Sequence, residues 1–261
     1  MLVYGDTNST LAGALAASKL HIPVVHVEAG LRSYNKRMPE EQNRIVTDHL
    51  STLLLCPTNQ AVLNLSREGL TDGVQWVGDV MYDAARFYAD RASAPATVAS
   101  SEPYYLVTVH RAENTDDPVR LKSIVAALNS VPERNAIFPM HPRTRKVMTN
   151  LGLSLDDHLR VIDPVGYYEM IWLEQHADFI LTDSGGVQKE AYFYRKPCGT
   201  LRDETEWVET VEAGANTLLG ADYDRIRGFL LDPPRPSRWD SLYGSGDAGG
   251  RVVDAIVELL Q

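Results

Sequence analysis

The residues of this sequence best suited to chemistry come directly after short apolar runs. In "FILTDSGGVQKEAYF" an apolar run leads straight into Ser184, Gly185 and Gly186. Glycines at a helix start let a phosphate approach backbone N–H groups at the positive helix end, and a serine hydroxyl adds a donor. An ordinary strand-to-helix turn with Ser184 as the N-cap explains the same residues about equally well. The fragment is neither GxGxxG nor GxSxG, so we set aside a dinucleotide fingerprint and a serine nucleophile elbow.

Histidine and arginine side chains follow two other apolar runs. His110 and Arg111 end "YLVTVHR", and an imidazole donor beside a guanidinium suits a leaving diphosphate. "FPMHPRTRK" repeats the arrangement with His141, Arg143 and Arg145. Taken alone, His110 is better explained as a structural histidine and Arg111 as an ion-pair partner. Three such positions in one half of the chain favour a nucleotide ligand.

Carboxylates occupy the corresponding positions in the first half of the chain. Asp6 follows the first apolar run, Glu28 follows "IPVVHV", and Glu40 begins "EEQNRIVTDHL" after a proline. Each has an alternative structural role. Asp6 suits a helix N-cap, Glu28 an ion pair with Arg32 or Arg44, and Glu40 the positive end of a helix.

Composition and cysteine spacing exclude several classes of function. His26 and Glu28 resemble the HxE of zinc deaminases, but the PCxxC partner is missing, so we predict no metal site. The net charge of -10 argues against a broad nucleic-acid surface. Cys56 and Cys198 lie in apolar surroundings outside any CxxC spacing, which indicates reduced thiols and a cytoplasmic location. No segment reads as a signal peptide, and no apolar run approaches the roughly 18 residues of a membrane span.

These residues must be positioned by alternating strands and helices. The first half predicts helices near residues 10–20, 40–50, 59–68 and 80–92, between the strand-like runs "MLVYG", "IPVVHVE", "TLLLCPT" and "VQWVGD". After the small-residue stretch "RASAPATVASSEP" the alternation restarts with "YYLVTVH", "NAIFPMH", "LRVIDPV", "DFILTDS" and "KPCGTLR". The pattern predicts an α/β protein with two parallel-sheet units, whose ligands bind at the carboxyl ends of the strands.

Seven collinear motifs carry a family resemblance over almost the whole chain. "GDTNSTLAGALAA", "HVEAGLRSYNKRMPEEQNRIVTDHL", "VGDVMYDA", "VTVHRAEN", "HPRTRK", "LTDSGGVQKEA" and "LRDETEWVETVEAG" together resemble the non-hydrolysing UDP-N-acetylglucosamine 2-epimerases. The resemblance implies two Rossmann-like domains of the glycosyltransferase-B-like type around a UDP-sugar cleft. It also implies interconversion of UDP-GlcNAc and UDP-ManNAc in bacterial envelope-sugar synthesis.

The same resemblance sets expectations for domains and partners. We expect a partial N-terminal Rossmann-like domain at 1–86, a linker at 87–101, a UDP-binding domain at 102–247, and a helix at 248–261 returning to the first domain. The family suggests a homodimer that uses no cofactor. The expected partner is a UDP-sugar, with UDP-GlcNAc also as a regulatory ligand, and neither nucleic acid nor a membrane.

Family chemistry assigns roles to the matching residues. The C2 proton is hardly acidic, so it must leave together with the anomeric diphosphate, and re-addition with protonation on the opposite face completes the inversion. Asp6, Glu28 and Glu40 resemble the acid/base carboxylates. The other matching residues are His110, assisting the diphosphate; Ser184, Gly185 and Gly186, cradling phosphate; Glu190, binding ribose; Arg44, in a second regulatory UDP-sugar site; and Arg111 and His141, binding substrate.

Two departures from the family pattern carry further expectations. An N-terminal stretch with a Gly-x-Arg-Pro turn precedes the GDT strand in the family, so we expect an internal start, an open sheet edge, exposed apolar side chains and reduced activity. Gly199 stands where the family carries a bulkier apolar residue, and we expect it to loosen its strand. Three alternative functions stay open: an impaired UDP-binding fragment, an epimerase of a related UDP-diacetamido uronic acid, and a glycosyltransferase.

Overall fold

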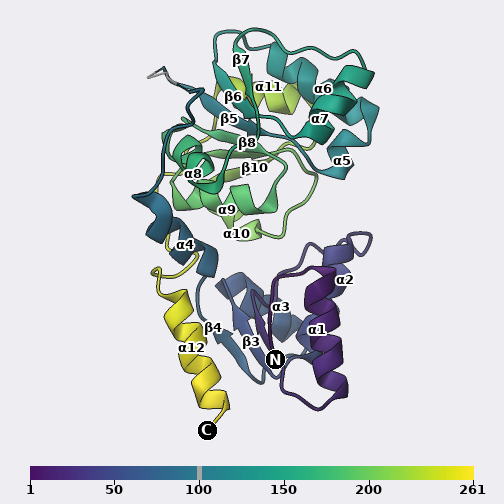
Figure 1. Cartoon of the computed structure of the whole chain (residues 1–261), viewed down its shortest axis with the longest axis vertical. Coiled ribbons are helices and arrows are strands. Elements are labelled where there is room, and N and C mark those ends of the chain that lie inside the picture. Colours follow the sequence, from purple (N-terminus) through teal and green to yellow (C-terminus); the bar gives the residue numbers. More distant parts are fainter. Residues whose placement is uncertain (99–101) are drawn as a thin grey trace. The chain divides into compact units, whose positions relative to one another are not determined.

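The computed structural model describes residues 1–98 and 102–261, so the part of the expected linker at 99–101 lies outside the described residues. The chain divides into two compact units, Met1–Arg86 with Asp240–Gln261, and Phe87–Trp239 (Figure 1). The second unit ends before the expected boundary at residue 247. Residues after Trp239 belong to the first unit because the N–H of Asp79 donates to the carbonyl of Tyr243 at 3.1 Å, and Arg86 donates to the carbonyl of Ser245.

The first unit is built on a parallel sheet with strand order β1-β2-β3-β4. Its strands are β1 (Leu2–Tyr4), β2 (Val25–Val27), β3 (Leu53–Cys56) and β4 (Val74–Trp76). Its helices are α1 (Asn8–Lys19), α2 (Pro39–Leu50), α3 (Asn59–Arg67) and α12 (Ala248–Leu259), and α4 (Val80–Ala89) runs across the unit boundary. All four strands match sequence-predicted runs. Because the order follows the sequence, the residues after β1 and β2 lie at neighbouring positions on one sheet edge.

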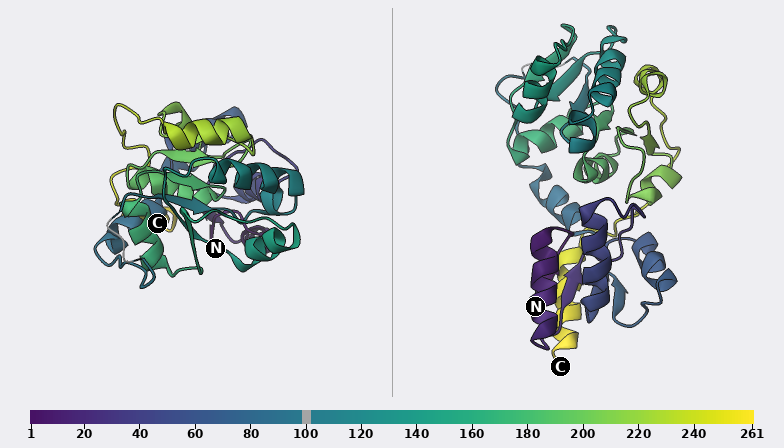
Figure 2. Two further views of the ribbon diagram at one scale, coloured as in Figure 1. Left: turned by 90° about the horizontal axis from the view of Figure 1, so that it is seen from above. Right: turned by 90° about the vertical axis from the view of Figure 1, so that its right-hand side faces the viewer.

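Helix α12 contributes apolar side chains to the core of the first unit. Val252 and Ala255 of α12 pack with Val25, Leu53 and Val77 in one buried cluster. Figure 2 shows α12, in yellow, beside the purple and blue elements of this unit. The amphipathic pattern of "RVVDAIVELLQ" is therefore used to cover the sheet.

Strand β1 lies at one edge of the first sheet. Among the described residues, it pairs with β2. Leu2 and Tyr4 are 55% and 47% exposed, whereas Val3 is buried against Ala14 and Ala17 of α1. One face of this strand is thus packed and the other is open.

The second unit contains a six-stranded parallel sheet of order β10-β9-β8-β5-β6-β7. Its strands are β5 (Tyr105–Thr108), β6 (Ala136–Pro139), β7 (Leu159–Ile162), β8 (Ile180–Thr182), β9 (Cys198–Thr200) and β10 (Asn216–Leu218). Its helices are α5 (Ala112–Thr115), α6 (Pro118–Asn129), α7 (Pro142–Asn150), α8 (Tyr167–His176), α9 (Gly185–Phe193), α10 (Val208–Glu212) and α11 (Tyr223–Leu231). The short strand β10 was not predicted, because three residues of mixed polarity carry no periodicity; only pairing with β9 defines it.

This strand order brings the three phosphate-compatible turns together. β8, β5 and β6 are neighbours, so the turns that follow them share one edge of the sheet. Every pairing is parallel. The core beneath them includes Tyr105 stacked on Phe179, with ring centroids 4.9 Å apart. Three separate sequence segments therefore converge on one edge.

Neighbouring side chains fill the space beside Gly199, and the expectation that this glycine loosens β9 stays a prediction. A Cβ at this position would lie 2.8 Å from side-chain carbons of Leu219 and Phe229 and 2.9 Å from Leu181. These three residues are buried in the main core of the unit. The missing side chain is thus compensated by close packing of its neighbours.

Both cysteines are free and buried, as predicted. Burial raises the pKa of the Cys198 thiol to about 12, and burial also raises the pKa of Cys56. Thiols are nucleophilic only as thiolates, so neither side chain is suited to covalent catalysis. Among the described helices, none is both long and apolar enough to cross a bilayer.

Candidate active site

A buried carboxylate joins two of the neighbouring turns in the second unit. Asp183, which follows β8, is fully buried and accepts hydrogen bonds from the backbone N–H groups of His110 and Arg111, at 3.0 Å each for Oδ2. Its Oδ1 lies 3.3 Å from Nδ1 of His110. Asn114 donates both to Asp183 and to the carbonyl of Leu201. The His110 turn and the Ser184 turn are therefore held in one arrangement.

The start of α9 provides backbone donors beside these side chains. The Ser184 hydroxyl accepts from the N–H of Val187 at 3.5 Å, so Ser184 is the N-cap. The first N–H groups of a helix have no carbonyl partner within it, and they carry partial positive charge. A Cβ on Gly185 would lie 2.8 Å from Oε1 of Glu206 and 3.5 Å from Nη2 of Arg111. A side chain at this position would therefore clash with Glu206 unless Glu206 moved.

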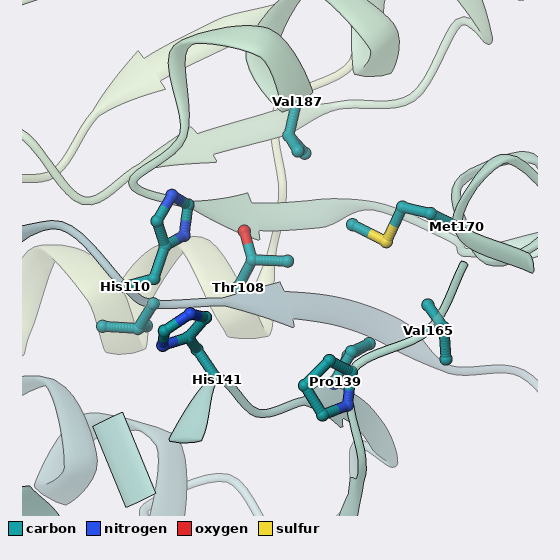
Figure 3. Close-up of a pocket in the computed structure, with 9 residues that line it drawn as sticks. Thr108, His110, Pro139, His141, Val165, Met170 and Val187 are labelled. Carbon is teal, nitrogen blue, oxygen red and sulfur yellow. The ribbon is translucent and has the colours of Figure 1, made fainter. Parts of the chain in front are cut away.

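A pocket of about 290 Å³ opens at the same edge (Figure 3). His110 and His141 lie on one side of it, and Thr108, the last residue of β5, also lines it. The lining also includes apolar side chains from several segments: Val109, Pro139, Pro164, Val165, Met170 and Val187. Apolar walls with a few polar groups are typical of small-ligand sites, and this one suits a flat base or nucleoside.

Glu190 lies in the second turn of α9, next to a second carboxyl group. Its side chain is buried and faces Glu174 of α8, which is fully buried. Burial, together with the nearby Glu190 carboxylate, raises the pKa of Glu174 well above its ordinary value. Burial, and then the two carboxyl groups, raise the pKa of the Tyr167 phenol to about 12. Glu174 and Tyr167 thus both lie near Glu190, and a raised pKa favours the neutral form of each.

Asp6 is an ion-pair partner rather than a helix cap. Thr7 is the N-cap of α1, and its hydroxyl accepts from the N–H of Thr10. The Asp6 Oδ2 atom lies 3.2 Å from Nη1 of Arg44, whose Nε is 3.3 Å from Glu41. Asp6 is partly exposed, whereas the Arg44 side chain is 1% exposed. The predicted role of Arg44 in a regulatory site stays a prediction; in this structure it holds Asp6.

Glu28 has a left-handed backbone, which is rare for a residue with a side chain. Its φ is 71°, directly after β2, and its N–H donates to the carbonyl of Leu55. Its Oε2 atom accepts from the Tyr4 hydroxyl at 3.5 Å. Such strain persists where the surroundings enforce it, often at functional sites.

The sequence suggested an ion pair between Glu28 and Arg32, but Arg32 forms its ion pairs with Asp48 and Glu68. The Arg32 guanidinium is buried and bonds Asp48 and Glu68, each at 2.7 Å. Burial alone lowers the pKa of Arg32, but the hydrogen bonds to these carboxylates outweigh it and raise that pKa.

Glu40 lies in the first turn of α2, after Pro39 at N1, and is half-buried. Its charge complements the positive end of that helix.

The two sheets thus gather the predicted residues into two groups. Asp6 and Glu28 follow adjacent strands of the first unit. The second group, at the ends of β8, β5 and β6, contains His110, Arg111, His141, Ser184, Gly185 and Gly186. Sequence reasoning missed Asp183, Asn114, Glu174 and the pocket walls at Pro164, Val165 and Met170. The position of Asp183 directly after a strand was a usable signal; buried Glu174 gave none.

Comparison with known proteins decides among the interpretations of this arrangement. A profile described as UDP-N-acetylglucosamine 2-epimerase matches residues 1–257. The chain belongs to the UDP-N-acetylglucosamine 2-epimerase family. These enzymes are isomerases, and the fold of this family member is α/β with two Rossmann-like units of the glycosyltransferase-B-like type. The family resemblance drawn from the motifs is confirmed.

Individual relatives of this epimerase-family chain span several organisms. A UDP-2,3-diacetamido-2,3-dideoxy-D-glucuronate 2-epimerase of Pseudomonas aeruginosa is 55% identical, over 99% of this chain and 75% of that protein. The crystal structure of Methanocaldococcus jannaschii UDP-GlcNAc 2-epimerase with UDP-GlcNAc and UDP has 42% identity and a TM-score of 0.89, covering 98% of this chain and 75% of that one. The S. aureus MnaA–UDP structure has 33% identity and a TM-score of 0.87, covering 99% and 74%. Archaeal relatives mean that the family does not establish a bacterial origin or an envelope role.

Proposed function

We propose that this chain inverts C2 of a UDP-2-acetamido sugar, interconverting UDP-GlcNAc and UDP-ManNAc. The reaction is an anti elimination of UDP followed by re-addition. The C2–H bond breaks, its electron pair forms the C1=C2 bond of 2-acetamidoglucal, and the C1–O bond breaks with its electrons passing to the diphosphate. Protonation of C2 on the opposite face and re-attack of UDP at C1 complete the inversion. Oxidation state does not change, so the proposal requires no redox cofactor.

One observation carries the proposal: the turns after β8, β5 and β6 share one sheet edge beside a nucleoside-sized pocket. Helix-terminal N–H groups at Gly185 and Gly186 suit the phosphates, with His110 and Arg111 as further donors. His141 lines the pocket. These groups would stabilise the charge of the departing UDP, which the elimination requires.

Acid/base roles belong to the carboxylates of the first unit in this proposal. Asp6 and Glu28 follow adjacent strands, and Glu40 begins α2. An inversion needs proton transfer on both faces of C2, so at least two such groups must act. Glu190, which lies beside Glu174, would accept hydrogen bonds from the ribose hydroxyl groups.

A second substrate is favoured by a specific observation. The Pseudomonas aeruginosa relative, named for a UDP-2,3-diacetamido-2,3-dideoxy-D-glucuronate, has 55% identity, against 42% for the Methanocaldococcus jannaschii UDP-GlcNAc enzyme structure. The chemistry at C1 and C2 is the same for both sugars. The candidates differ only in what surrounds C3 and C6. We therefore propose the diacetamido uronate as the second candidate substrate.

The experiment is proton NMR of the purified chain in D2O with each UDP-sugar in turn. Deuterium entering C2 together with the C2 epimer supports the proposed reaction, and the faster substrate identifies the sugar. UDP binding without exchange at C2 for either sugar contradicts it and favours the impaired UDP-binding fragment. Transfer of the sugar to an added acceptor would instead support a glycosyltransferase.

A further inference from the structure

His26, a residue without a role in the proposed reaction so far, lies at the centre of the first unit. It belongs to β2 and its side chain is completely buried. Its Nδ1 atom lies 2.6 Å from Oδ1 of Asp48, on α2. Its Nε2 atom lies 2.9 Å from the backbone carbonyl oxygen of Gly5, directly after β1. The imidazole therefore bridges a helix and the turn that carries Asp6.

Both ring nitrogens of His26 have a hydrogen-bond partner. A carbonyl oxygen can only accept, so Nε2 must carry a proton to bond Gly5. Asp48 is itself held in place, because its Oδ2 atom accepts from Arg32 at 2.7 Å and from the N–H of Gly30 at 3.2 Å. The ring is therefore fixed at both ends, to the turn after β1 and to α2.

The neighbours of His26 are themselves paired. Asp48 contacts both His26 and Arg32. Arg32 is paired in addition with Glu68 at 2.7 Å. The buried Arg32 thus faces two carboxylates, an arrangement in which a buried charge is paired and hydrogen-bonded. Cys56, also close to Asp48 and Arg32, is a neutral thiol because burial raises its pKa.

The bridge fixes the backbone on both sides of the candidate carboxylates. Gly5 is held by its N–H, which donates to the carbonyl of Val27 at 3.1 Å, and by its carbonyl, which accepts from His26. Asp6 follows Gly5 immediately. Glu28 follows Val27 and has the left-handed φ of 71°. The turns carrying the two carboxylates are thus tied to one buried ring.

We infer that His26 is a positioning residue, a buried imidazole that bonds Gly5 and Asp48 and so holds Asp6 and Glu28 in register for proton transfer at C2. This inference rests on the proposed epimerase function. Small displacements of catalytic groups are costly, since about 1 Å can lower a rate roughly 10²-fold. The ring acts through Asp6 and Glu28 and need not touch the substrate.

The hydrogen bond to Gly5 is tested on the intact chain by long-range ¹H–¹⁵N NMR of ¹⁵N-histidine protein, with the His26 signal assigned by its loss in His26→Gln. We expect Nε2 of His26 to carry a proton that exchanges slowly with solvent. An unprotonated Nε2 in the His26 ring would overturn the inference. This readout does not depend on activity.

The positioning role is tested by the C2 exchange rate and UDP affinity of His26→Gln. We expect exchange to fall about 10²-fold while the dissociation constant for UDP, which the second unit determines in our proposal, is unchanged. His49→Gln is the matched control, because His49 lies on the same helix as Asp48 and is 48% exposed. Unchanged exchange in folded His26→Gln overturns the inference; absence of exchange in the wild-type chain overturns the proposed function instead. If His26→Gln fails to fold, the NMR result decides.

Discussion

Asp183 accepts hydrogen bonds from the backbone N–H of His110 with both carboxylate oxygens, at 3.1 and 3.0 Å. This contact crosses from the turn after β8 to the turn after β5, two segments more than seventy residues apart in sequence. Its carboxylate oxygens also accept from the N–H of Arg111 and from Asn114, and Oδ1 lies 3.3 Å from Nδ1 of His110. A structural carboxylate therefore aligns the donors for an anionic ligand without itself lining the pocket.

Replacing Asp183 with Asn should lower both stability and UDP affinity. The amide NH₂ would face the N–H groups of His110 and Arg111, leaving a buried donor unsatisfied at a cost of about 1–3 kcal/mol. Urea unfolding and isothermal titration with UDP measure the two effects. The exposed Asp157→Asn is the control, and equal behaviour of the two variants would contradict this account.

The free energy of unfolding should fall as pH rises, because the pKa of Glu174 is raised in the folded chain. Its pKa is raised in the folded chain, so the folded state binds more protons than the unfolded state above the ordinary value of 4.5. The associated stability is complete below that pH and is lost as pH rises through the folded-state pKa. Glu174→Gln stays neutral and can still donate to Glu190. This variant should therefore show a weaker dependence of stability on pH, and it should be more stable than wild type at neutral pH. Urea midpoints across the pH range test this, with exposed Glu133→Gln expected to match wild type.

Removing either candidate acid/base carboxylate should reduce catalysis without weakening nucleotide binding. Asp6→Asn and Glu28→Gln each remove one proton-transfer group, and such groups contribute about 10²–10⁴-fold in rate. C2 deuterium exchange measures the loss, and UDP titration measures binding. Exposed Asp72→Asn serves as the control. Wild-type exchange in both variants would exclude these residues as the acid/base pair.

Gly30 should tolerate no side chain. Its φ is +81°, and a Cβ would lie 2.5 Å from the carbonyl oxygen of Ala61. Gly69 has the same φ of +81° with nothing within 4 Å, so Gly69→Ala isolates the backbone strain, about 1–2 kcal/mol. Urea unfolding should show a clearly larger loss for Gly30→Ala. Equal losses would mean that the backbone relaxes around Ala61.

The sequence by itself determined the strand-and-helix alternation, because apolar runs and helix periodicity are local properties. Of the ten strands in the described part of the chain, nine correspond to runs recognised in the sequence. Collinear motifs determined the family, and the phosphate-compatible residues were recognisable because each follows a strand. The short β10 escaped, since it exists only by pairing with β9.

Tertiary structure alone decided what the buried polar residues do. The roles of Asp183, Glu174 and His26 depend on partners from distant segments, and no local pattern specifies a partner. Gly199 shows the same limit: its local propensity predicted a loosened strand, but Leu219 and Phe229 fill the space. A buried polar group must be satisfied by whatever the fold brings beside it. Its function is therefore fixed only when the strands are ordered and the helices are packed.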